Sequence, residues 1–213
     1  MTSPPTATSF ALLGLLAVQP WPAYELVAQS KRSLHYFWPR SEAHLYAELK
    51  RLVERGHAHA AAIEGRGRQR TRYTITPAGR AALEDWLGTR PASPVLEVET
   101  LLRVLFADQG SIEDLRAALA ATASQARQAG AAAVVIGDEL LNTGGPFPDR
   151  LHLTERVVAF YGEFLLLLIR WCDETSAEVG TWSTTKDLGL TPQARQRLCE
   201  LLTEARQIMS VQS

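Results

Sequence analysis

The periodicity of the apolar residues changes at Gly56, and this change constrains the fold more than any other feature of the chain. Before Gly56, four apolar residues recur at the spacing of one helix face: Leu45, Leu49, Leu52 and Val53. After it, residues 57–64 and 70–76 read as strands, and the second alternates cleanly between apolar and polar positions. The pattern predicts a helix capped by Ser41 and ended by Gly56, followed by a hairpin.

The predicted helix of residues 41–55 has a basic face opposite its apolar stripe. That face carries Ala43, His44, Ala47, Lys50 and Arg51, while Glu42 and Glu48 stand on its flanks. A small residue such as Ala47 at the centre of a polar face lets a helix backbone approach a groove closely. We therefore expect this face to contact a partner.

Arginines occupy every second position along the predicted hairpin, with no acidic residue between Gly65 and Arg80. They are Arg66, Arg68, Arg70 and Arg72. Because four guanidinium groups along one edge repel one another, this row favours an anionic partner over a merely solvated hairpin.

Helices are also predicted on both sides of this segment. Ser9 is a suitable N-cap for a helix that ends before Pro20, and Pro22 suits the first turn of a second helix. Thr76 and Pro77 open a helix that ends at Gly88 and whose apolar side includes Leu83, Trp86 and Leu87.

The charge distribution and a Pro-rich stretch divide the chain into two predicted domains. The formal net charge is −1, but residues 1–90 have an excess of five positive charges and residues 91–213 an excess of six negative ones. Residues 89–94 have the composition of a linker. The sequence therefore predicts domains at about 8–90 and about 94–210.

The second domain reads as helical throughout. Its expected helices cover residues 94–107, 112–142, 150–179 and 192–208, and Ser111 with Asp114 forms a capping-box-like start for the second of them. The fold class expected for the whole chain is mainly α: an N-terminal winged helix-turn-helix with a two-stranded β wing, followed by an all-α dimerisation domain.

Specific motifs of residues 9–90 resemble the PadR family of bacterial transcriptional regulators. They fall in the order Leu12–Leu16, Ala23–Leu26, Phe37–Pro39, Leu45–Leu52, Gly56 and Arg72–Gly79. One departure is Pro22-Ala23, where the family often has His-Gly before Tyr-Glu-Leu. The helical remainder is similar in layout to the virulence-activator-like C-terminal domain of the longer PadR subfamily.

The resemblance implies a homodimeric regulator, commonly a repressor, that binds double-stranded DNA at an inverted repeat. It implies that the third helix enters the major groove while the wing contacts the backbone or minor groove. Family positions implied to meet DNA are Ser41, His44, Tyr46, Arg68, Arg70 and Arg72. The helix face adds Lys50 and Arg51 as phosphate contacts, and the arginine row adds Arg66.

The segment from Val157 to Ile169 is apolar on nearly all sides, which predicts packing partners on several faces. The expected dimer interface consists of Phe160, Phe164, Leu165, Leu168 and Trp171. The alternative function is a sensor whose helical domain binds a small aromatic effector near Trp171 and Trp182 and thereby modulates DNA binding.

Several other classes of protein are disfavoured. The chain has no nucleotide-binding, serine-hydrolase or zinc-protease motif, and His57 with His59 offers too few ligands for a metal, so we expect no enzyme and no cofactor. Two isolated cysteines fit a reducing compartment, and no apolar stretch reaches the 20 or so residues of a membrane span. The predicted location is the cytoplasm.

Overall fold

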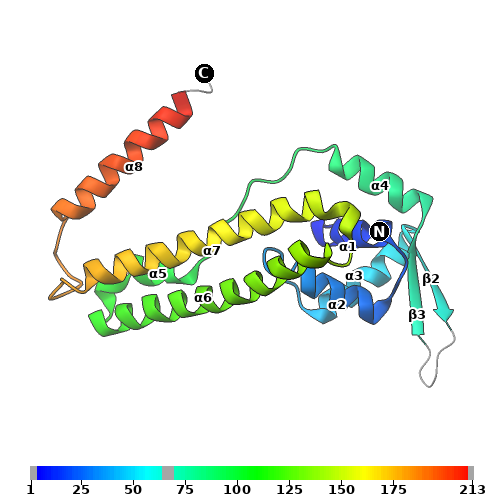
Figure 1. Ribbon diagram of the computed structural model, residues 1–213, viewed down its shortest axis with the longest axis horizontal. Coiled ribbons are helices and arrows are strands. Elements are labelled where there is room, and N and C mark those ends of the chain that lie inside the picture. The colour runs from blue at the N-terminus through cyan, green and yellow to red at the C-terminus, as the bar shows by residue number, and fades with distance from the viewer. Residues whose placement is uncertain (1–3, 64–69, 211–213) are drawn as a thin grey trace. The chain divides into compact units, whose positions relative to one another are not determined.

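The computed structural model describes residues 4–63 and 70–210 and divides into two compact units, Met1–Pro94 and Val95–Ser213. Most of the described chain is helical, with one small antiparallel sheet in the first unit (Figure 1). This confirms the expected mainly α fold class. None of the helices in the described ranges has both the length and the apolar character needed to cross a membrane.

The first unit contains four helices and three strands among its described residues. In chain order these are α1 (Ala7–Val18), β1 (Trp21–Pro22), α2 (Ala23–Ser33), α3 (Glu42–Glu54), β2 (Ala58–Ile63), β3 (Arg70–Ile75) and α4 (Pro77–Leu87). The sheet order is β1-β3-β2, with both pairs antiparallel, and Ala58 stands opposite Ile75 at the base of the hairpin. The wing predicted as two-stranded therefore has a short third strand.

Two details at the starts of α1 and α2 differ from the prediction. The N-cap of α1 is Thr6, and Ser9 is instead the third helical residue, where its hydroxyl completes a capping box. Pro22 lies in β1 opposite Arg72 and is the N-cap of α2 rather than a first-turn residue. Sheet pairing holds Pro22 in an extended conformation, which a helical first turn would not allow.

The core of the first unit forms where α1, α2, α3 and the base of the hairpin meet. Its fully buried leucines are Leu12, Leu13, Leu16, Leu26, Leu49 and Leu52. On α3, the predicted stripe faces this core, and Val53 at its edge is half-buried. Each fully buried leucine contributes about 1.5–3 kcal/mol relative to an exposed one, so this stripe fixes which face of α3 remains outside.

The second unit consists of helices in its described part. They are α5 (Glu99–Leu105), η1 (Ala107–Gln109), α6 (Ile112–Thr143), η2 (Pro148–Arg150), α7 (Leu151–Val179) and α8 (Pro192–Ser210). The prediction of a helix from residue 94 was wrong, because α5 begins at Glu99 after the extended Val98. The capping box of Ser111 and Asp114 is present, and Gly144 ends α6 in the left-handed conformation.

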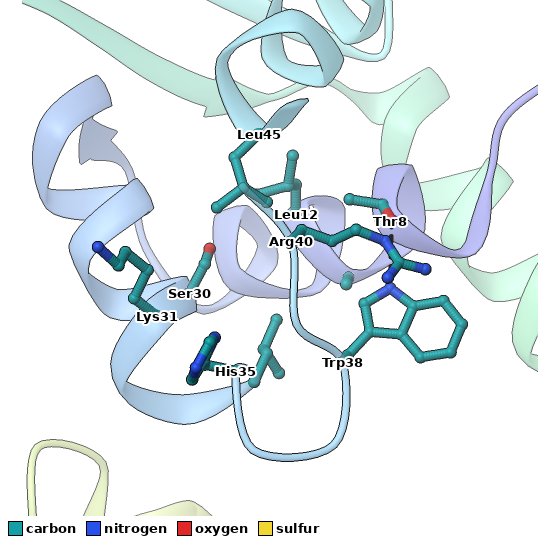
Figure 2. Close-up of a pocket in the computed structure, with 10 residues that line it drawn as sticks. Thr8, Leu12, Ser30, Lys31, His35, Trp38, Arg40 and Leu45 are labelled. Carbon is teal, nitrogen blue, oxygen red and sulfur yellow. Dashed lines mark hydrogen bonds between the residues drawn. The ribbon is translucent and has the colours of Figure 1, made fainter. Parts of the chain in front are cut away.

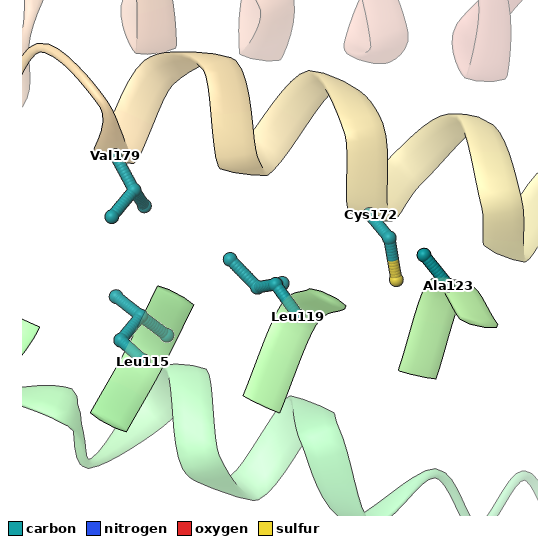
Figure 3. Close-up of a cluster of buried hydrophobic side chains, with 5 residues drawn as sticks. All are labelled: Leu115, Leu119, Ala123, Cys172 and Val179. Atoms are coloured by element: carbon teal, nitrogen blue, oxygen red, sulfur yellow. The ribbon is translucent and has the colours of Figure 1, made fainter. Parts of the chain in front are cut away.

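Helices α6 and α7 lie side by side along much of their length (Figure 1). A buried cluster between them consists of Leu115, Leu119 and Ala123 from α6 with Cys172 and Val179 from α7 (Figure 3). At the edge of the pair, Arg127 and Asp173 form an ion pair at 2.6 Å. The two helices therefore make a hairpin with its own apolar core.

Candidate nucleic-acid interface

The N-terminus of α3 is fixed by side-chain contacts. The hydroxyl of Ser41 accepts a hydrogen bond from the backbone N–H of His44 at 3.3 Å, which confirms Ser41 as the cap. Lys31 of α2 pairs with Glu42 in the first turn at 2.7 Å. Because this lysine offsets the negative charge of Glu42, the start of the helix stays compatible with an anionic partner.

The face of α3 opposite the core is open to solvent. Ala43, Lys50 and Arg51 are exposed, while His44 and Ala47 are half-buried. Tyr46 lies at the margin of the stripe, with 38% of its surface exposed. The residues of the predicted basic face are thus exposed or half-buried, and Lys50 and Arg51 are its exposed cations.

Glu48, which the sequence places on the flank of the basic face of α3, is turned into the domain. Its side chain is fully buried, and it accepts a hydrogen bond from the Ser9 hydroxyl of α1 at 2.5 Å and an ion-pair hydrogen bond from Arg51. Burial by itself raises the pKa of Glu48, but the hydrogen bonds from Ser9 and Arg51 outweigh it and hold the pKa below its ordinary value. Periodicity alone could not find this contact, because it depends on how α1 crosses α3.

The two described arginines of the wing project from one face of β3. Arg70 and Arg72 are exposed, whereas Ile75 on the other face is buried. The guanidinium of Arg70 lies 5.4 Å from the centre of the Tyr24 ring at the start of α2. The other two predicted wing arginines, Arg66 and Arg68, lie outside the described residues.

The base of the hairpin is tied to the following helix. The carbonyl of His57 accepts the N–H of Thr76 at 3.0 Å, and the Thr76 hydroxyl donates to the carbonyl of Gly56 at 2.6 Å and caps α4. Gly56 has a φ of +72°, a conformation that favours glycine and turns the chain from α3 into β2. These bonds fix the hairpin relative to α3.

A small hollow opens beside the connection between α2 and α3 (Figure 2). Trp38 donates from its indole nitrogen to the Thr8 hydroxyl at 3.1 Å, and the Arg40 guanidinium stacks 4.7 Å from the centre of the Trp38 ring. Lys31 and His35 line the opposite side. These contacts fix the connection that leads into α3, although the sequence indicated only that it ends at Pro39.

The predicted interface residues of α7 divide into two groups. Leu165 is buried within the chain, and Leu168 and Trp171 pack beside the cluster between α6 and α7. Phe164 is half-buried, whereas Phe160 is 71% exposed. Trp182 packs against the same cluster as Trp171, so the two candidate effector residues border one apolar region.

No group of three or more potential metal ligands occurs within residues 4–63 and 70–210. His57 has a buried Nδ1 for which the described residues provide no hydrogen-bond partner, and His59 is exposed on β2.

The order of helices and strands, the capped third helix with a basic outer face and the arginine-bearing hairpin define the first unit as a winged helix-turn-helix. Residues 12–85 match the Transcriptional regulator PadR-like family. The chain thus carries a PadR-like domain, and its place in the longer subfamily stays a prediction.

Individual relatives agree with this family assignment. The negative transcriptional regulator PadR of Bacillus subtilis (strain 168) is 30% identical over 99 residues, which are 46% of this chain and 54% of the relative. The chain spans about half the length of the curated relatives it matches.

Solved structures share the fold over a longer stretch. The crystal structure of Bacillus subtilis PadR in complex with operator DNA covers 82% of this chain and 99% of its own, with a TM-score of 0.69 and 21% identity. The complex of that protein with p-coumaric acid gives a TM-score of 0.65 and 20% identity, with coverage of 82% and 99%. At sequence identities of 20% and 21%, the similarity to these structures establishes the fold alone.

Proposed function

We propose that this protein is a sequence-specific DNA-binding transcriptional regulator without catalytic activity. The observation that carries the proposal is the basic outer face of α3 next to the arginine-bearing wing in one winged helix-turn-helix. In this fold the third helix enters the major groove and the wing contacts the backbone or minor groove. A DNA target agrees with the cytoplasmic location predicted from the cysteine content.

The residues of α3 and β3 take different roles in this proposal. His44 reads base edges from the first turns of α3, and Tyr46 reaches a phosphate with its hydroxyl. Ser41 contributes mainly by capping α3, because its hydroxyl already accepts a backbone N–H. Lys50, Arg51 and the wing arginines bind phosphates and supply the salt-dependent part of the affinity.

The protein would act as a homodimer on an inverted repeat, with the second unit forming the contact between the two copies. Apolar residues of α7 recur on one face and are exposed: Leu153, Val157, Phe160 and Leu167. Helix α8 has no buried residue among those described and exposes a second apolar stripe, formed by Leu198, Leu201, Leu202, Ile208 and Met209. Because exposed apolar surface of this kind is covered in stable proteins, a second copy is the expected partner.

Repression is the expected direction of regulation, since the matched relative is named a negative transcriptional regulator. The second candidate function is sensing of a small aromatic effector. It is supported by Trp171 and Trp182, which border the same cluster, and by the relative solved with p-coumaric acid. In that case, adding small aromatic acids would change the tryptophan fluorescence and the affinity for DNA together.

A footprint of the purified protein on DNA upstream of its own gene, at near-physiological salt, tests the main proposal. A protected and roughly palindromic stretch with half-sites about 34–36 Å apart is expected. Diffuse binding that disappears as salt rises, both with and without aromatic compounds, would refute the site-specific function.

A further inference from the structure

We propose that Glu48 is a positioning residue for DNA recognition: from inside the domain it holds Arg51 in one orientation, so that Arg51 binds one phosphate in a fixed register. The inference deepens the proposed function and rests on it. It assigns a role in recognition to a residue that cannot itself touch DNA, because its side chain is fully buried.

The first support is that the two side chains of the Glu48–Arg51 ion pair differ in their exposure to solvent. The side chain of Arg51 is 48% exposed on the outer face of α3, while that of Glu48 is 0% exposed. An arginine carries five N–H donors, and its bond to Glu48 engages one of its terminal nitrogens. The guanidinium is therefore anchored at one side and open at the other.

The second support is that Glu48 is itself anchored. The Ser9 hydroxyl that donates to it is also fully buried and accepts the backbone N–H of Thr6 at 3.0 Å. A chain of hydrogen bonds thus runs from the start of α1 through Glu48 to Arg51. Because Ser9 belongs to the cap of α1, the carboxylate has a firm attachment to the body of the domain.

The third support is the position of Glu48 in the helix. His44, Glu48 and Arg51 follow one another at i, i+4 and i+7, so they lie along one line of α3. Two residues assigned to DNA contact thus flank the buried carboxylate. Phosphate contacts from fixed side chains set the register of a protein on the duplex, and mobile side chains do this less well.

The ion pair between Glu48 and Arg51 also reduces the net positive charge at this part of α3. The carboxylate of Glu48 offsets the positive charge of Arg51, which lowers its attraction for any phosphate backbone. Glu48 therefore lowers the affinity for DNA in general and, in return, fixes the orientation of the Arg51 side chain. Removing its charge should weaken binding to the correct site, while binding to DNA of unrelated sequence holds or rises. A purely structural defect would weaken both.

The test compares the full-length protein with its Glu48→Gln variant on two duplexes: one selected by the wild-type protein from a random pool, and one of scrambled sequence. Glutamine keeps the shape and one oxygen that accepts from Arg51. It removes the charge and replaces the oxygen that accepts from Ser9 by an NH₂ group, which can only donate to the Ser9 hydroxyl. We expect the affinity for the selected duplex to fall about tenfold, the scale of one charge-assisted hydrogen bond. Affinity for the scrambled duplex should hold or rise, with a salt slope steeper by up to about one unit.

The matched control is Glu54→Gln, which removes the same charge from an exposed position of the same helix. It should leave the ratio of the two affinities within about twofold of the wild type. In an Arg51→Ala background, Glu48→Gln should no longer change this ratio, because the effect acts through Arg51.

The mobility of the Arg51 side chain in the protein without DNA provides a second test, which does not depend on the size of the change in DNA affinity. The ¹⁵N relaxation of the Arg51 Nε–H should report a restricted side chain in the wild type and a mobile one in Glu48→Gln. If the glutamine variant fails to fold, Ser9→Ala replaces it: this variant leaves both charges intact, and its Arg51 side chain should be more mobile than that of the wild type.

Three outcomes would overturn the inference. The first is a parallel loss of affinity for both duplexes, and the second is an effect of Glu48→Gln that persists without Arg51. The third is an equally mobile Arg51 in both proteins. If the wild type selects no duplex at all, the proposed function itself fails, and this inference fails with it.

Discussion

Gly79→Ala should destabilise the winged helix, although alanine is the better helix former. Gly79 is in the first turn of α4, where its backbone lies against His57 and the base of the wing. A Cβ at this position would lie 2.1 Å from the carbonyl oxygen of His57 and 3.0 Å from Cγ1 of Ile75. The carbonyl oxygen belongs to the backbone and accepts the N–H of Thr76, so it cannot turn away as a flexible side chain would.

The magnitude follows from these distances. Restoring even a tight contact of 3.0 Å requires a movement of nearly 1 Å, and overpacking of this kind costs about 1–3 kcal/mol. Weakening the hydrogen bond between His57 and Thr76 adds about 0.5–1.5 kcal/mol. The higher helix propensity of alanine offsets about 0.5–1 kcal/mol of this loss. The net expectation is a loss of about 0.5–4 kcal/mol, centred near 2 kcal/mol.

Gly14→Ala is the matched control, because Gly14 is also helical and a Cβ there would meet no atom within 4 Å. It should stabilise the same unit by about 0.5–1 kcal/mol. Scanning calorimetry of the full chain separates the effects of opposite sign, since a change of 1 kcal/mol shifts the midpoint of a domain this size by about 4–8 °C. Equal shifts in both variants would refute the close approach of α4 to His57.

Three further predictions test the interface, the oligomeric state and the buried carboxylate. Arg70→Ala with Arg72→Ala should weaken binding to every duplex and flatten the plot of log affinity against log salt by up to about two units; an unchanged slope would remove the wing from the interface. Phe160→Glu with Leu167→Glu should convert the dimer to a folded monomer in sedimentation, because both side chains are exposed within the chain, and a persistent dimer would place the contact elsewhere. The folded-state pKa of Glu48 lies below its ordinary value of 4.5, so its ionised form stabilises the protein at neutral pH and this contribution is lost as the pH falls through the folded-state pKa. The difference in free energy of unfolding between wild type and Glu48→Gln should therefore shrink from pH 7 to about pH 3, whereas a constant difference would show that the carboxylate has no ionic partner.

The sequence predicted most of the helices because their signals are local. A cap such as Ser41, a capping box such as Ser111 with Asp114, and a glycine such as Gly56 each act within a few residues. The prediction was wrong where a distant segment decides the conformation. Strand β1 exists only because β3 lies beside it, and this pairing is what keeps Pro22 out of α2.

The sequence by itself determined the winged helix-turn-helix, the basic face of α3 and the arginine row, because apolar periodicity and charge placement are properties of neighbouring residues. Tertiary structure alone decided the burial of Glu48, which periodicity placed on the flank of the basic face and which the packing of α1 against α3 buries beside Ser9. It also separated Leu165, which packs within the chain, from Phe160, which does not. Burial of this kind depends on which surfaces meet in space, and a one-dimensional pattern carries that information only for a residue's own helix or strand.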